Sequence, residues 1–588
     1  MATSSSNVAL LTTLRVLTFC ALAAAATTTL LPLAVSPCSH SLSRTILAAT
    51  GLDPFLLSCT GDASDAPPLS SHGDVDGANH KTSKASRPIV TDQLCVKGEV
   101  PPDALPPFQC CPPASASEPI NFTFPDPGEP LRTRRLVHVV GDEYMAKYAR
   151  AVALMKSLPV SDPRSFYQQA NVHCAYCTGA HRQAGRPDLG VQIHFSWLFF
   201  PFHRAYLYFF ERIAAKLLGD PGFALPIWSW DVPEGMGIPE AFADVASPLY
   251  DPIREPSHAP PKVADLDFFL QGEKNLTDQQ LILHNLRVMY RQMVSGATLP
   301  SLFLGQPYRA GDPEMPGPGT VEWAPHNTMH TWTGDNSRPN AENMGAYYSA
   351  GRDPLFYPHH GNIDRLWETW RNDIVGPDGS RRRHADFTDP DWLDSSFLLY
   401  DEEARLVRIT VRDVLDADKL RYTYGDVAVP WLAARPPITP GVNPKPKGGL
   451  RLESVRFPVS LDAAVTVEVR RPPRAQQLRR SLEEKAREEV LVIQGIEADA
   501  GDFVRSDVYV NAREYYKVPV GGREMAGTFA TLKHPGKEGM VVRTSMRVAL
   551  SEVLEDLGAQ GDESVTVTLV PVRGKVRIGG LKIVYMEE

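Results

Sequence analysis

The chain has 588 residues, more than a single folded domain usually holds, so we expect two or three domains. Hydrophobic residues make up 43% and charged residues 22%, as in ordinary soluble globular proteins, and a net charge of −9 gives no reason to expect a nucleic-acid partner. The 52 prolines indicate many turns and ordered loops instead of long helices throughout.

The N-terminal stretch is typical of a targeting sequence. Residues 1–50 contain no Asp or Glu and only two arginines, and an apolar run with small residues follows Arg15. A membrane anchor is the alternative, but threonines and Pro32 interrupt the run, and polar low-complexity chain follows it. We therefore interpret 1–87 as a leader and linker, place the mature start near Pro88, and expect no transmembrane segment in the mature chain.

Cysteines cluster near the start of the mature region. The five that follow the leader are Cys95, Cys110, Cys111, Cys174 and Cys177. Because neighbouring cysteines cannot easily bridge to each other, Cys110 and Cys111 each need a different partner. The odd count predicts two disulfides, one remaining sulfur and an oxidising compartment.

The next part of the chain has helical periodicity. Apolar residues at helical spacing begin near Val139. The expected helices cover about 145–158, 165–177, 194–218, 278–294 and 362–374. Several of these segments carry histidines, and a four-helix bundle is a common place for buried metal ions. We predict a mainly α-helical catalytic domain built around such a bundle.

The pattern changes after residue 400. Two short strands are expected at 407–415 and 420–427, and a Pro/Gly-rich stretch follows at 434–450. Alternation of valines, as in Val465, Val467 and Val469, then predicts strands to the end of the chain. We interpret this part, called the tail below, as an antiparallel β-sandwich. The predicted boundaries are a catalytic domain at 88–425, a linker at 426–455 and the tail at 456–588.

Seven histidines form two groups that suggest two facing metal ions. The first group is His173, His194 and His203, and the second is His326, His330, His359 and His360. On a helix, a spacing of four residues puts His326 and His330 on one face, about 6 Å apart along the axis, so both can share a metal. Either member of the His359–His360 pair can then supply a third ligand.

The first group poses a geometric problem. His194 and His203 are nine residues apart, and nine residues turn a helix through about 900°, which leaves the two side chains on opposite faces. Either His194 precedes the helix, or the chain bends near Pro201.

Imidazole ligands suit copper, zinc, iron or nickel. Zinc hydrolases often include a carboxylate ligand, and structural zinc favours cysteine, so three histidines per metal, twice, favour paired copper over zinc. We expect the remaining isolated histidines to be ordinary surface or core residues, among them His72, His80, His258, His384 and His534.

Three stretches around these histidines resemble one family. HCAYC with QIHFSWLFFPFHR, EWAPHNTMHTWTGD, and DPLFYPHHGNIDRLW are similar to the plant polyphenol oxidases, the catechol oxidase and tyrosinase family with a type-3 dicopper centre. The PDWLDSS segment (within about 380–430), the YTYGDV motif and the β-rich tail extend the resemblance over residues 89–588. The resemblance implies a copper enzyme that oxidises o-diphenols to o-quinones and reduces O₂ to water.

The resemblance also implies roles for particular residues. The ligands of copper A would be His173, His194 and His203, and those of copper B would be His326, His330 and His360. His359 would lie beside the metal without binding it, and Asp364 would orient a ligand or stabilise the helix. Cys177 would form a thioether with His194, and the disulfides would be Cys95–Cys111 and Cys110–Cys174.

Three residues bear on the choice of phenol. Glu322 matches a family position that holds an ordered water, and Asn327 follows His326 where several relatives are apolar. The resemblance implies that this pair can deprotonate a monophenol, so hydroxylation of monophenols is a further expectation; alternatively, Asn327 is only a polar residue at the rim. Tyr347 occupies a gate position at which relatives usually carry Phe.

The tail departs from the family pattern. Relatives often carry Lys-Phe-Asp-Val, of which only Asp507 and Val508 are present here. By resemblance, the tail covers the copper pocket and keeps the enzyme latent until a protease cuts the linker; a purely structural tail is the alternative. The main rival to an enzyme is an oxygen carrier of the haemocyanin kind.

Two compartments fit the leader. The family is usually plastidic and lies in the thylakoid lumen, but this leader has one Arg before its apolar run and no twin-Arg motif, so the secretory pathway or vacuole is the alternative. Two sequons, at Asn121 and Asn275, would be glycosylated only on the secretory route.

Overall fold

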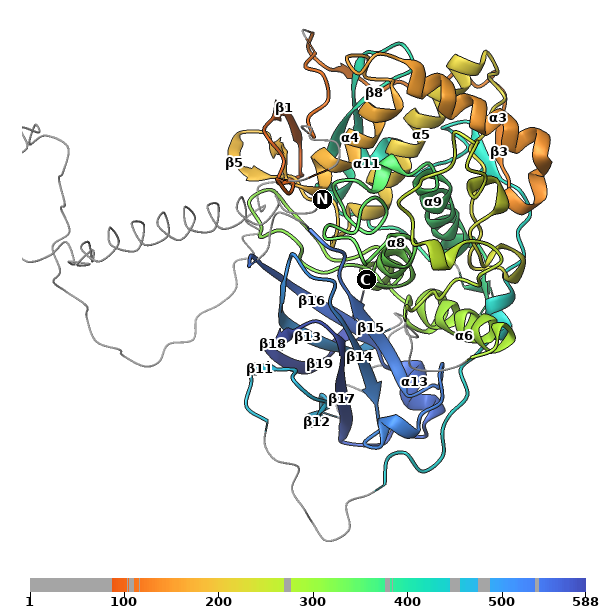
Figure 1. Cartoon of the computed structure of the whole chain (residues 1–588). Coiled ribbons are helices and arrows are strands. Elements are labelled where there is room, and N and C mark those ends of the chain that lie inside the picture. The colour runs from red at the N-terminus through yellow and green to blue at the C-terminus, as the bar shows by residue number, and fades with distance from the viewer. Residues whose placement is uncertain are drawn as a thin grey trace, which may run out of the picture. The chain divides into compact units, whose positions relative to one another are not determined.

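A computed structural model gives the fold of the chain from residue 87 onward (Figure 1). The described residues are 87–587 without 103, 105–109, 116, 269–275, 376–380, 383, 445–454, 474–486 and 535–538. The predicted leader, apart from Arg87, and the sequon residue Asn275 lie outside this set. Lys84–Glu588 form one compact unit. No helix in the described ranges is both long and apolar enough to span a membrane.

The part of the chain before the linker is mainly helical. Its longer helices are α3 (Val137–Ser157), α4 (Phe166–Cys177), α5 (Phe199–Leu218), α6 (Asp278–Tyr290), α8 (Asn327–Thr333) and α9 (Phe356–Asn372). Local sequence explains several ends: Ser165 caps α4 by accepting from Gln168 N, and Gly219 ends α5 with a φ of 66°. Helices α4, α5 and α9 gather in the upper half of the view in Figure 1.

Short strands surround these helices. They are β1 (Thr91–Cys95), β4 (His181–Gln183) and β5 (Arg186–Gly190) in one sheet, β2 (Ile120–Asn121), β9 (Leu406–Thr410) and β8 (Ser396–Tyr400) in a second, β3 (Arg132–Arg134) with β10 (Tyr422–Tyr424), and β6 (Ile374–Val375) with β7 (Arg381–Arg382). Asn121 pairs with Arg408 of β9 and is exposed.

Some predicted boundaries were wrong. The helix expected from residue 194 begins only at Phe199, because Phe195 has a φ of 59° that no α-helix allows. The helix expected from residue 362 begins at Phe356 and therefore includes both His359 and His360. The strand expected over 407–415 ends at Thr410, which caps the short helix α11 (Val411–Val414) in a capping box with Asp413.

The tail is β-rich, as the alternation predicted. One antiparallel sheet has the order β11 (Val459–Ser460), β18 (Val576–Ile578), β13 (Glu488–Asp499) and β16 (Val541–Ala549), with β19 (Gly580–Met586) also paired to β13. The second has the order β12 (Val465–Arg470), β17 (Ser564–Arg573), β14 (Arg505–Val510) and β15 (Met525–Ala530). Val467 and Val469 pair with Val567 and Val565, and all four are buried. These blue strands form the lower part of the view in Figure 1.

Much of the segment predicted as a linker is docked. Trp431, in the short turn η8 (Pro430–Ala433), is fully buried, and its indole donates to Asp231 Oδ2 at 3.0 Å. Residues 435–442 lie on the tail. Arg523 N donates to the Pro437 carbonyl at 2.8 Å, and Val442 is buried among apolar tail residues that include Tyr509. Of the predicted linker, residues 445–454 lie outside the described set.

Candidate metal centre

Two groups of buried histidines face each other between the helices. The first is His173 from α4, His194 from the loop before α5, and His203 from α5. The second is His326 from the irregular turn η6 (Glu322–His326), His330 from α8, and His359 and His360 from α9. Within each group one ring nitrogen per residue lies within 4.8 Å of the others.

The two groups are in direct contact across the site. The rings of His203 and His360 stack with their centroids 4.1 Å apart, and those of His194 and His326 lie 5.7 Å apart. Phe356, one turn before His360 on α9, packs against His360 at 4.2 Å and against His173 at 4.8 Å. This geometry can hold two metal ions side by side in an apolar setting.

For four of the rings, a hydrogen bond at Nδ1 leaves the lone pair on Nε2. A carbonyl can only accept, so a ring whose Nδ1 bonds to a carbonyl carries its hydrogen there and keeps a lone pair on Nε2. This holds for His173 with Tyr347 O at 2.9 Å, His203 with Phe199 O at 2.8 Å, and His330 with Met344 O at 2.9 Å. His326 Nδ1 bonds to Asn327 Oδ1 at 3.0 Å in the same sense.

The free nitrogens are buried without a protein partner. Among the described residues, no hydrogen bond reaches Nε2 of His173, His194, His203 or His326. A buried polar atom without a partner is costly, and one metal ion in each group would satisfy these nitrogens. The residues present therefore fit a pair of metal ions.

The same argument separates His359 from His360, which distance alone does not. Trp230 Nε1, which can only donate, bonds to His359 Nδ1 at 3.0 Å. The neutral His359 ring must then carry its hydrogen on Nε2 and has no lone pair there for a metal. His360 Nε2, by contrast, lies 3.3 Å from His330 Nε2, pointing into the second group. The geometry favours His360 as the third ligand.

Burial keeps all of these rings neutral. Burial lowers the pKa of His203 to about 3 and that of His330 to about 4. Burial, with the other histidines as a smaller cause, holds the pKa of His173, His194, His326 and His360 well below the usual range. Neutral imidazole is the form that binds a metal, so the set is ready for ligation at neutral pH.

His194 lies outside α5, which resolves the problem posed by its spacing from His203. The side chain of Gln192 positions it: Nε2 donates to the Cys177 carbonyl at 2.9 Å, and Oε1 accepts from His194 N at 3.0 Å. Cys177 is buried and unpaired, and burial raises the pKa of its thiol. Gln192 was missed from the sequence, because a glutamine two residues before a histidine carries no signal of its own.

The remaining cysteines are paired. Cys95 is bonded to Cys111, and Cys110 to Cys174. Cys174 is the residue after His173 on α4, so the second disulfide ties the N-terminal loop directly to the first histidine group.

Glu322 and Asn327 are both buried near the second group. Glu322 Oε1 accepts from Phe195 N at 2.6 Å, and burial holds the pKa of this carboxyl well above its usual range. Asn327 is fully buried in the intact chain, where the tail lies against it. Its Nδ2 donates to the carbonyl of Ala530 in the tail at 2.9 Å.

Tyr347 lies between the first histidine group and the tail. Its ring is 4.5 Å from that of His194 and 4.2 Å from that of His534 in the tail. Its backbone N–H donates to the Lys533 carbonyl at 3.4 Å. His534, expected to be an ordinary histidine, is thus a buried neighbour of the site; nothing in its local sequence indicates this, since its partner is nearly two hundred residues away.

Among the described residues, the hydrogen-bond partners of Asp364 are arginines and tyrosines. Its carboxylate accepts from Arg204 Nε at 2.6 Å, from Arg134 Nη1 at 3.0 Å and from the Tyr422 hydroxyl at 2.7 Å, and the Tyr424 hydroxyl is a further donor. Of its two predicted roles, these contacts favour stabilisation of the helix. The two tyrosines are those of the YTYGDV motif.

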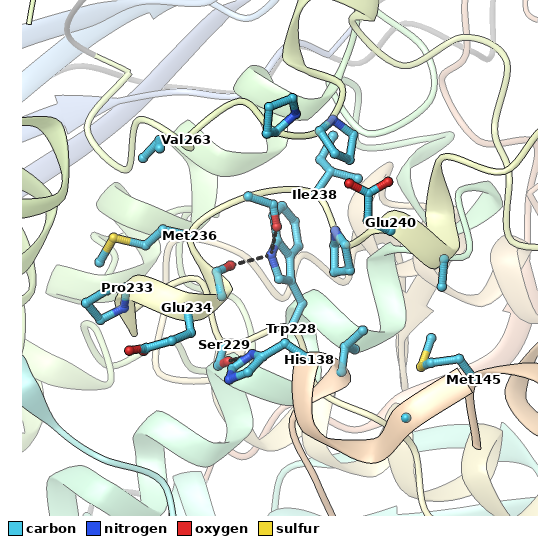
Figure 2. Close-up of a pocket in the computed structure, with 18 of the residues that line it drawn as sticks. His138, Met145, Trp228, Ser229, Pro233, Glu234, Met236, Ile238, Glu240 and Val263 are labelled. Carbon is cyan, nitrogen blue, oxygen red and sulfur yellow. Dashed lines mark hydrogen bonds between the residues drawn. The ribbon is translucent and has the colours of Figure 1, made fainter. Parts of the chain in front are cut away.

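A separate cavity of about 430 Å³ is lined by Trp228 and its neighbours (Figure 2). The indole of Trp228 donates to the Gly235 and Gly237 carbonyls at 3.0 and 2.7 Å. The lining includes His138 and Glu234, which are exposed, and none of the predicted site residues. The residues that line this cavity therefore form no further group of histidines.

Comparisons with known proteins agree with this geometry. The common central domain of tyrosinase matches residues 163–373, the polyphenol oxidase middle domain 386–437, and the chloroplastic polyphenol oxidase C-terminal domain 457–585. A chloroplastic polyphenol oxidase of Vitis vinifera is 48% identical over 83% of this chain and 80% of its own, and aureusidin synthase of Antirrhinum majus is 47% identical over 84% and 87%. The structure of latent apple tyrosinase matches with a TM-score of 0.71 and 46% identity, covering 80% of this chain and all of that one.

Proposed function

This chain belongs to the plant polyphenol oxidases, and from that membership we propose that it oxidises o-diphenols (catechols) to o-quinones at a pair of copper ions. Two diphenols are oxidised for each O₂ that is reduced to two waters. The observation that carries the proposal is the facing arrangement of two buried histidine groups whose free nitrogens have no protein partner.

We assign three ligands to each copper ion. His173, His194 and His203 hold copper A, and His326, His330 and His360 hold copper B. When bound, the copper pair supplies the electron transfer between the diphenol and O₂. The backbone carbonyls on Nδ1 orient the rings, and the aromatic packing around them excludes water.

Cys177 is proposed to be the covalent tether of His194. Forming a bond between its Sγ and a ring carbon of His194 removes the thiol hydrogen, one ring hydrogen and two electrons, which copper and O₂ can accept. Gln192 supports this proposal, because it bonds to the backbones of both residues and holds the two segments together. A tether would fix a ligand that no helix holds. Peptide mass spectrometry should find the Cys177 and His194 peptides linked and lighter by two hydrogen atoms.

Monophenols are a second class of substrate to test. The buried pair of Glu322 and Asn327 supports their hydroxylation, as does the name of the apple relative, a tyrosinase. In the intact chain, however, the amide of Asn327 is bonded to Ala530 of the tail. With activities compared at equal copper content, we expect Asn327→Leu to lower monophenol hydroxylation more than diphenol oxidation; equal losses would count against a role in proton transfer.

The tail is proposed to keep the enzyme latent. Support comes from the ring of His534 against Tyr347, the contact of Phe529 with Trp323 at 4.6 Å, and the relative solved in a latent form. Since Trp431 and Val442 are buried, we place the activating cut between residues 443 and 455, within the predicted linker of 426–455.

The helix bundle, the sandwich of the tail and the compartment are likewise proposals. We propose that α4, α5, α8 and α9 act as the four-helix bundle of the catalytic domain (88–425) and that the two tail sheets pack face to face as a sandwich (456–588). The Vitis vinifera polyphenol oxidase is named chloroplastic, which supports a plastid. Within the plastid, the thylakoid lumen is proposed from the family resemblance alone. Sequencing the mature N-terminus and testing Asn121 for glycan would decide against the secretory pathway or support it.

The deciding experiment is a quinone assay. The copper-loaded chain, intact and cut in the linker, is given a catechol in air while quinone absorbance and O₂ consumption are followed. We expect two quinones per O₂, with a faster rate after the cut. Reversible O₂ binding without quinone from either form would show an oxygen carrier, and two zinc ions without copper would indicate a hydrolase.

A further inference from the structure

Asn327 connects the tail to a histidine of the second group. Its side-chain oxygen accepts from His326 Nδ1 at 3.0 Å, and its side-chain nitrogen donates to the Ala530 carbonyl at 2.9 Å. Ala530 is the last residue of β15, and all three residues are fully buried. A continuous path of two hydrogen bonds therefore joins the tail backbone to a ring of the candidate metal centre.

This support differs from that of the other rings. His173, His203 and His330 bond through Nδ1 to backbone carbonyls of Tyr347, Phe199 and Met344. A carbonyl can only accept, so those rings have one possible hydrogen position. A side-chain amide can turn over and present its NH₂ group instead, which would force the hydrogen of the ring onto the other nitrogen.

The Ala530 carbonyl removes this freedom. It needs a donor, so it holds the Asn327 nitrogen toward the tail and thereby the oxygen toward His326. Without the tail, the same amide could turn and leave His326 with its hydrogen on Nε2, the nitrogen that faces the second group. A ring protonated there has no lone pair for a metal.

We propose that Asn327 is a positioning residue through which the docked tail holds His326 in its metal-binding form, so that the tail both covers the site and stabilises the second metal position. The proposal rests on the proposed function in that it takes copper as the metal. It gives the tail a task at the second histidine group that a simple cover would not have.

The test uses the full-length chain with His203→Ala, which leaves the second group as the one complete copper site. Release of copper to EDTA at neutral pH is timed for this parent and after Asn327→Leu, Asn327→Asp or Thr331→Val. Hydrogen–deuterium exchange of residues 525–534 reports the hold on the tail, and exchange in α3 reports whether each variant is folded. Thr331 is the control, because its hydroxyl bonds to the Asn327 backbone carbonyl in the same helix and touches neither hydrogen bond of the amide.

The variants should separate the two hydrogen bonds. Leucine makes neither bond, so copper release should become about 10–100-fold faster and exchange in 525–534 should rise. Ionised aspartate still accepts from His326 but cannot donate to Ala530, so exchange should rise while copper release stays close to that of the parent. Thr331→Val should change neither quantity.

Two results would overturn the proposal. Copper release from Asn327→Leu at the parent rate would show that Asn327 does not hold His326. Faster release with unchanged exchange in 525–534 would show that the tail does not act through Asn327. A parent that binds no copper would contradict the proposed function instead, and the exchange measurement would still test the bond to Ala530.

Discussion

The two histidine groups are alike in ligand type and differ in what holds the ligands. In the first, His173 and His203 bond to backbone carbonyls, and Gln192 fixes the loop of His194. In the second, His330 bonds to a backbone carbonyl, but His326 depends on an amide that is shared with the tail. A ring whose Nδ1 bonds to a backbone carbonyl has one hydrogen position, whereas a ring held by a side-chain amide that also bonds to the tail can respond to changes in the tail.

Removing one ligand from each group gives the largest expected effect. In each variant, one of the two metal ions keeps only two ligands. His330→Ala and His203→Ala should therefore each halve the copper content and reduce catechol oxidation to the level of the copper-free chain. Metal analysis and quinone formation measure both outcomes. Retained oxidation in His330→Ala would mean that the second group is not part of the active site.

The next prediction tests what the two groups share. Asp364 on α9 bonds to Arg204 on α5, so it joins the helices of His360 and His203. Asp364→Asn should lower the free energy of unfolding by about 3–5 kcal/mol, since buried arginines lose their counter-charge, and both copper positions should weaken alike. Urea unfolding and copper content measure this.

An exposed ion pair provides the control for Asp364. Asp394 and Arg412 are bonded at 2.6 Å but are each about half exposed, so Asp394→Asn should change stability by less than about 1 kcal/mol. If Asp364→Asn has as small an effect, the buried network does not hold the two helices together.

One contribution to the pH dependence of stability should come from a histidine at the contact with the tail. His284 on α6 is buried at the contact with the tail, with Asp267, Arg291 and the tail residue Arg505 around it, and burial lowers its pKa to about 4. The unfolded chain takes up a proton near pH 6.5 that the folded chain refuses, so stability falls as the pH drops from about 6.5 to about 4, by up to about 3 kcal/mol. Above pH 6.5 this group contributes no slope.

Urea unfolding at a series of pH values measures this effect. His284→Asn should reduce the slope between pH 6.5 and 4 by the contribution of one proton, since the substituted residue does not titrate, while the buried histidines of the two groups keep their contributions. An unchanged slope in that variant would assign the acid sensitivity to other groups.

The sequence predicted what local pattern can encode. Spacing of four residues identified His326 and His330, and valine alternation identified the tail strands. The predicted start of α5 was wrong, because the apolar run around Phe195 contains no residue that marks the end of a helix. Helix α5 does not extend back to Phe195, whose N–H is bonded instead to the distant Glu322. Resemblance named Asn327 and Tyr347, but their contacts with Ala530 and His534 join segments about two hundred residues apart, which no periodicity records.

A smaller effect is expected from the proposed tether in the first group. In the His330→Ala chain, Cys177→Ser should speed copper release to EDTA by about 10-fold, because His194 then relies on Gln192 alone. The same substitution in the His203→Ala chain should leave release unchanged. Equal release in both backgrounds would mean that Cys177 does not act on the first group in particular.

The smallest effect is expected from the hydrogen bond between Trp230 and His359. Trp230→Phe removes the indole that bonds to His359 Nδ1, and losing one buried hydrogen bond should lower stability by about 1 kcal/mol. Copper content should not change if His359 is only a neighbour of the metal. Trp228→Phe is the control, since its indole bonds to the Gly235 and Gly237 carbonyls.

Substituting the two histidines themselves tests the same choice directly. His360→Gln should lose one copper and His359→Gln should keep both; the reverse result would show that the hydrogen bond from Trp230 does not determine which of the two rings binds the metal.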